Sequence, residues 1–139
     1  MSNQLFQGKE QIFKDVIRLA QTWKNTYESS GFEGGGFQEI QEFNESPIGQ
    51  KVKAEKEALE SYMASLSFDD IKMLQTIMYL GRDRDYDNDM TPEEIYNDYL
   101  ESFNQRGWKT KNIETRQMTQ KLPLSDYLNT GLEILNVKY

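Results

Sequence analysis

The sequence predicts an all-α fold, a single-domain bundle of about five helices with a flexible glycine-rich loop at 30–46 and an acidic loop at 83–91. Apolar residues recur at helical spacing in most of the chain. Cap residues precede several of these stretches. The sole strand candidate, 38–43, is weak. A chain of 139 residues also fits one domain, 1–139.

The first predicted helix covers residues 9–29, where apolar side chains recur with charged residues between them. Residues 30–46 then interrupt the pattern, because three consecutive glycines, Gly34 to Gly36, give a flexible backbone. We expect this segment to be a mobile connection with its phenylalanines packed on the core.

Two serines mark the next helix starts. Ser46, followed by Pro47, is typical of an N-cap and a first helical residue, and the helix should run to about Leu66. Ser67 caps a helix at 68–80 that is apolar over much of its circumference.

Because it is so apolar, helix 68–80 should be central and packed by 9–29, 92–105 and 124–135. Gly81 is expected to end it in a left-handed conformation.

Thr91, Pro92 and two following glutamates open a helix at 92–105, and Gly107 stops it. Residues 108–117 are read as a loop or a short helix, with a further turn near 116–121. The last helix spans 124–135. Gly131 on its apolar face indicates either a close helix–helix approach or a simple cost in helix propensity.

Composition excludes several classes of chemistry. The chain has no cysteine and no histidine, which removes thiolate sites and the commonest general base. A formal net charge of −7 argues against binding to phosphate-rich nucleic acid. No apolar run is long enough to span a bilayer, and residues 1–11 carry no secretion signal, so we expect a cytoplasmic protein.

The acidic loop has the spacing of a calcium-binding helix–loop–helix at 83–94. Counting Asp83 as position 1 places acids and other oxygen donors where such loops carry ligands, and the candidate metal ligands are Asp83, Asp85, Asp87, Asp89 and Glu94. Position 6 is Asn88 where glycine is usual. A solvated acidic loop, or a site for Mg²⁺ or another ion, is the alternative. We expect no other cofactor.

Charge is distributed unevenly. Residues 83–101 hold eight acids against one base, and residues 106–121 hold five bases against one acid. The two surfaces could partly neutralise each other or be screened by salt. Alternatively, the acidic face steers a basic protein partner. Trp108 is the one stacking aromatic in the basic segment, which also disfavours nucleic-acid binding.

A carboxylate-based enzyme is a further alternative, with Asp69 and Asp70 or Glu93 and Glu94 as acid and base. Adjacent helical residues point about 100° apart, so neither pair converges on one substrate. We identify no catalytic residue. The leading prediction is a non-enzymatic interaction or regulatory module, which an exposed apolar patch would favour. The sequence leaves the oligomeric state open.

Two segments resemble a family of small uncharacterised bacterial proteins, a domain of unknown function. Its pattern has Leu-Gly-Arg at a helix end, then Tyr-Asp, and a carboxy-terminal Pro-Leu, Asp-Tyr-Leu and Gly-Leu. The matching residues are Leu80, Gly81, Arg82, Tyr86, Asp87, Pro123, Leu124, Asp126, Tyr127, Leu128, Gly131 and Leu132. The resemblance implies a helical domain and brings no activity, cofactor or catalytic residue with it. The extra acids between Arg82 and Pro92 depart from the pattern.

Overall fold

The computed structural model describes residues 5–139, which form seven helices and no strand. Residues 1–4, part of the segment expected to lack a secretion signal, lie outside the described residues. The helices are α1 (Glu10–Ser29), α2 (Phe37–Glu45), α3 (Pro47–Ala64), α4 (Phe68–Asp83), α5 (Pro92–Arg106), α6 (Lys111–Thr119) and α7 (Leu124–Ile134).

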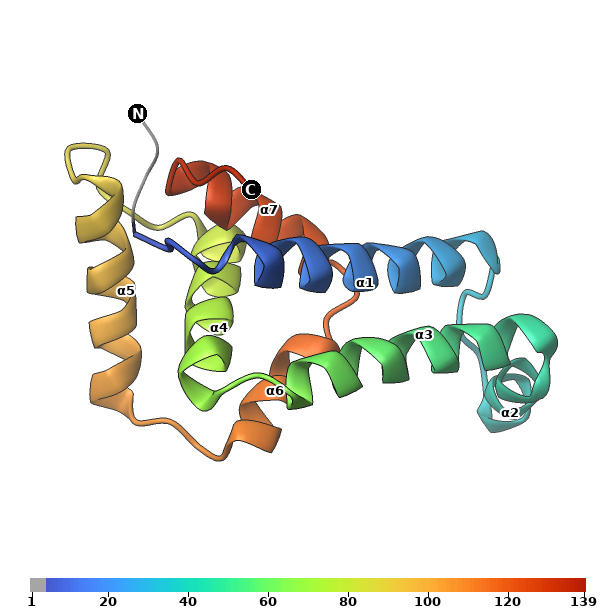
Figure 1. Cartoon of the computed structure of the whole chain (residues 1–139). Helices are drawn as coiled ribbons and strands as arrows, with labels where there is room; N and C mark the ends of the chain where they lie inside the picture. Colours follow the sequence, from blue (N-terminus) through green and yellow to red (C-terminus); the bar gives the residue numbers. More distant parts are fainter. Residues whose placement is uncertain (1–4) are drawn as a thin grey trace.

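Helix α4 is the centre of the packing. It packs chiefly against α7 and also contacts α5 and α6. Helices α1 and α3 lie side by side and antiparallel, with α2 at their far end and α5 at the opposite edge of the molecule (Figure 1). Nine α4 residues are buried, as its apolar circumference predicts. Helix α1 was expected to pack on α4, but it packs mainly on α3 and α7.

The all-α prediction is confirmed, but about five helices is too few. Residues 37–45, expected to be part of a loop, form α2. Its first residue, Phe37, is 84% exposed rather than packed on the core, whereas Phe43 stacks on Phe32 at 4.2 Å. Side-chain pairs four residues apart, such as Gln38 with Glu42, support this short helix.

The segment 108–117, predicted to be a loop or a short helix, is helical from Lys111 onward, where it belongs to α6. Thr110 caps it by accepting a hydrogen bond from the Ile113 backbone N–H at 3.2 Å. The predicted serine caps are also present, since Ser46 accepts from Gly49 N–H and Ser67 from Asp70 N–H.

Gly81 does not end α4, contrary to the prediction. The helix continues to Asp83, and Arg84 takes the left-handed conformation with φ 54° while its N–H donates to the Leu80 carbonyl at 2.8 Å. Gly81 is instead buried where α4 crosses α7. A Cβ there would overlap the Tyr127 carbonyl and approach Gly131 N to 2.7 Å.

Gly131 is the reciprocal contact on α7. A Cβ at Gly131 would overlap the Ile77 carbonyl of α4 and lie 2.8 Å from the Ile77 side chain. Of the two explanations predicted for Gly131, the close helix–helix approach is therefore confirmed. Among the described residues, no helix combines the length and the apolar character needed to cross a membrane.

Replacing Gly131 with alanine should destabilise the fold by about 1–3 kcal/mol, because the added methyl group meets backbone that cannot rotate away. Urea unfolding monitored by circular dichroism measures this loss. The matched control is Glu133→Ala on the exposed side of the same helix, which should change stability by less than about 0.5 kcal/mol. Equal stability of the two variants would contradict the close crossing.

Candidate functional site

A pocket of about 520 Å³ opens where α4, α5, the α5–α6 connection and α6 meet. We call it the α4–α5 pocket. It is within the usual size range of ligand-binding clefts. Its lining residues are Gln75, Tyr79, Arg82, Asp83, Asp85, Asp98, Tyr99, Ser102, Phe103, Arg106, Gly107, Trp108, Lys109, Glu114 and Gln117.

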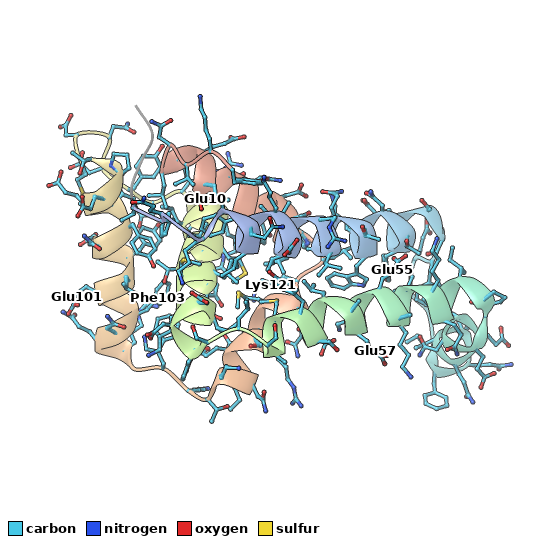
Figure 2. The ribbon with its side chains drawn as sticks, viewed as in Figure 1. Glu10, Glu55, Glu57, Glu101, Phe103 and Lys121 are labelled. Atoms are coloured by element: carbon cyan, nitrogen blue, oxygen red, sulfur yellow. The ribbon has the colours of Figure 1, made fainter. Side chains whose placement is uncertain are left out.

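Four partly buried aromatic residues line the pocket: Tyr79 from α4, Tyr99 and Phe103 from α5, and Trp108 from the connection. The Phe103 ring centroid is 5.5 Å from that of Tyr79, 6.4 Å from Tyr99 and 5.7 Å from Trp108. Phe103 thus joins the other three, and Figure 2 shows it on the side of α5 that faces α4. Tyr99 and Phe103 lie on the apolar side of α5, and at the pocket both are partly exposed.

Two buried polar side chains also line the pocket. Gln75 is 4% exposed and Glu114 is 5% exposed. Gln75 Nε2 donates to Glu114 Oε1 at 3.0 Å, and the Lys109 backbone N–H donates to Glu114 Oε2 at 3.1 Å. Gln75 Oε1 has no hydrogen-bond partner among the described residues. An unpaired buried carbonyl of this kind is unusual in folded proteins.

Two of the chain's own arginines lie over rings of the pocket. The Arg82 guanidinium carbon is 4.5 Å from the Tyr79 ring centroid, and that of Arg106 is 5.3 Å from the Phe103 centroid. Arg82 also pairs with Asp83, with Nε–Oδ1 at 2.8 Å. This pair raises the pKa of Arg82, as hydrogen bonding to Asp83 favours the charged guanidinium.

The candidate metal ligands do not converge. Asp83 and Asp85 line the pocket, whereas Asp87, Asp89 and Glu94 do not. Asp87 Oδ1 accepts from the Asp89 backbone N–H at 2.9 Å, which forms a local turn. Within the described part of the chain, no three acidic residues are grouped so that they could hold a metal ion.

The backbone of the loop also differs from the expected calcium-binding form. Arg84, at position 2, has positive φ. Asn88, at position 6, where such loops usually need a positive φ, does not have one. Calcium binding by this loop stays a prediction, and it would require the loop to rearrange.

Tyr99 ties the acidic loop to α5. Its hydroxyl donates to the Asp85 carbonyl at 2.7 Å and accepts from the Asp85 backbone N–H at 3.1 Å. Burial raises the pKa of the Tyr99 phenol further above neutral pH, so the hydroxyl carries the proton that it donates. This paired contact fixes the position of Asp85 at the pocket.

Glu94 has a structural partner at the start of α5. Its Oε1 accepts from the Thr91 N–H at 2.9 Å, while Thr91 Oγ1 accepts from the Glu94 N–H at 3.2 Å, which completes a capping box. The predicted cap at Thr91 is therefore confirmed. The hydrogen bond from the Thr91 backbone lowers the pKa of Glu94.

Gln75, Tyr79 and Glu114 were not predicted as site residues. A signal existed for two of them. Gln75 interrupts the apolar surface of the helix expected to be most buried, and Glu114 is the single acid in the basic segment. Neither signal indicates the other, because they lie 39 residues apart in sequence.

No protein-family model, curated protein or solved structure matches this chain. The resemblance to small bacterial proteins therefore stays a prediction, and the site must be interpreted from its own residues.

Acid should destabilise the wild-type protein more than it destabilises Glu94→Gln. The folded-state pKa of Glu94 is lowered, so its contribution is complete above the unfolded pKa and is lost as pH falls through the folded value. Thermal unfolding midpoints at about pH 6 and about pH 3 measure the difference. Glu93→Gln, in the same helical turn, is the control. Identical acid sensitivity of wild type and Glu94→Gln would contradict the assigned role.

The calcium prediction is tested by thermal unfolding in chelator, followed by added Ca²⁺ or Mg²⁺. If the loop binds calcium, the folded state should gain about 2.7 kcal/mol at a concentration of 100 times Kd. Asp83→Asn should abolish the gain. An unchanged midpoint at about 1 mM Ca²⁺, far above the Kd range of calcium sensors, would refute the prediction.

Proposed function

We propose that this protein is a non-enzymatic interaction module that binds a basic segment of a partner protein beside the α4–α5 pocket. The observation that carries the proposal is a set of exposed carboxylates with almost no cationic partners. All eight acids of residues 83–101 are exposed, and of these eight only Asp83 forms an ion pair within the described part of the chain. Unpaired like charges of this kind favour an oppositely charged partner.

The basic segment 106–121 does not supply the missing cations, because no ion pair joins it to these acids among residues 5–139. Lys111 instead donates to the carbonyls of Ala64 and Leu66 at the end of α3, at 2.8 and 2.6 Å. Mutual neutralisation of the two segments by direct contact is therefore not supported.

The acids are not equivalent in position. Asp85 and Asp98 line the α4–α5 pocket. Glu101 lies on the opposite side of α5 from Phe103 (Figure 2). The proposed contact surface therefore consists of the acids at the pocket, and Glu101 lies outside it.

Other observations fit the same proposal. Phe37, Ile40 and Ile48 are exposed apolar side chains on α2 and the start of α3, at the opposite end of the molecule from α5 (Figure 1), so they fit an interaction module in general and not the contact at the pocket. The carboxylate pairs weighed for catalysis do not line the α4–α5 pocket, and Asp70 is paired with Lys9 at 2.8 Å. The net charge of −7 would repel nucleic acid. A cytoplasmic location and membership of the bacterial family belong to the proposal.

A short lysine-rich peptide should bind the wild-type protein, with affinity that falls as NaCl is raised from about 50 mM to about 500 mM. Asp85→Asn and Asp98→Asn should each weaken binding about two- to fivefold, the effect of losing one exposed ion pair. Isothermal titration calorimetry measures both changes.

Glu101→Gln and Glu57→Gln are matched controls, because each also removes one exposed negative charge. Glu101 lies on the same helix as Asp98, and Glu57 lies on α3 (Figure 2). Both variants should keep wild-type affinity. Equal weakening by all four substitutions would show that net charge alone, and not the position of the acids at the pocket, determines the affinity. Absence of binding would refute the proposed function.

A further inference from the structure

The α4–α5 pocket combines hydrogen-bond acceptors with aromatic walls. Gln75 Oε1 is buried without a partner among the described residues, and each Glu114 carboxylate oxygen accepts one bond and has capacity for another. Both residues line the pocket. A ligand that brings N–H donors would satisfy these atoms. Because Gln75 Oε1 is covered in the free protein, the donor reaches it only as the lining side chains part.

The charges of the lining indicate how much positive charge the pocket accepts. Four acids and three bases line it, and the Arg82–Asp83 pair cancels within the protein. The remaining acids are Asp85, Asp98 and Glu114, against Arg106 and Lys109. Within the lining itself, one carboxylate is left without a lining base, which matches a single cationic group; beside the lining, the ammonium groups of Lys72 and Lys121 lie over the Trp108 and Tyr79 rings at 5.7 and 5.4 Å.

The aromatic walls favour a planar cation over a compact one. A guanidinium is weakly hydrated, stacks on aromatic faces and carries five N–H donors, whereas an ammonium is a strongly hydrated point charge. The protein places its own cations over these rings: the guanidinium groups of Arg82 and Arg106 lie nearest, at 4.5 and 5.3 Å from the Tyr79 and Phe103 centroids. The ammonium groups of Lys121 and Lys72 lie 5.4 and 5.7 Å from the Tyr79 and Trp108 centroids. Arg106 is exposed and is held by one long hydrogen bond, 3.4 Å to Ser102 Oγ, and by its contact with the Phe103 ring at 5.3 Å, so an incoming guanidinium has to take its place on that ring.

We propose that the α4–α5 pocket receives the side chain of one arginine from the basic segment of the partner protein. This inference rests on the proposed function and names the residue that the partner must present. The guanidinium stacks beside Phe103 and Trp108 and donates to Gln75 and Glu114. Asp85 and Asp98 contact the basic residues on either side of that arginine.

The test uses three peptides that differ at one central position in an otherwise lysine-rich sequence: arginine, lysine or citrulline. Citrulline keeps the planar shape but loses the charge. The arginine peptide should bind at least about tenfold more tightly than the citrulline peptide, with lysine between them, because charge-assisted hydrogen bonds are the stronger class. The Trp108 indole N–H resonance should shift with the arginine peptide most strongly.

Variants on the protein locate the effect. Gln75→Leu and Phe103→Leu should each remove most of the preference for arginine over citrulline, while Glu101→Gln should keep it. Circular dichroism confirms that each variant is folded. Because Phe103 is only partly buried, Phe103→Leu should fold, and it still tests the proposal if Gln75→Leu does not fold.

The outcomes separate this inference from the proposed function. Equal affinity for the three peptides, with Asp98→Asn still weakening binding, would overturn the arginine pocket and leave the interaction module standing. Failure of all three peptides to bind would overturn both. A preference for arginine that survives Phe103→Leu and Gln75→Leu would place the arginine elsewhere on the acidic surface and overturn the pocket.

Discussion

The crossing of α4 and α7 at two glycines is the constraint on which the other packing depends. Gly81 and Gly131 leave no room for a Cβ, so the two backbones are in direct contact. Because α4 lies against α7 along this crossing, its remaining surface is free to hold α5 and α6. Close backbone approach replaces the side-chain interdigitation that normally sets the distance between helices.

Helix α5 depends on α4 for its position, and this arrangement creates the pocket. Among the main helix contacts, α5 packs on α4 alone. Its buried residues are Ile95 and Tyr96, near its start, while Phe103 near its end is partly exposed. Phe6 adds an edge-to-face contact with Tyr96 at 4.8 Å, which supports the same end. The end of α5 with less support borders the pocket.

The sequence predicted the features that depend on neighbouring residues. Helix spacing and caps at Ser46, Ser67 and Thr91 identified α3, α4 and α5, because both are local. The prediction that α4 ends at Gly81 was wrong. Gly81 has no side chain because α7 packs directly against it, and local sequence rules cannot detect that contact. Helix α2 was missed because the preceding glycines suggested a longer loop. The pocket was not predicted, since Gln75 and Glu114 meet only after folding.

The hydroxyl of Tyr99 uses both its donor and its acceptor on one residue of the acidic loop. The Asp85 backbone therefore cannot shift along α5 without losing two hydrogen bonds together. The position of the Asp85 backbone relative to Asp98 is then set by the rigid geometry of α5, although Asp85 belongs to a loop. A basic segment that binds as proposed would therefore meet acidic residues whose backbone positions are fixed relative to each other.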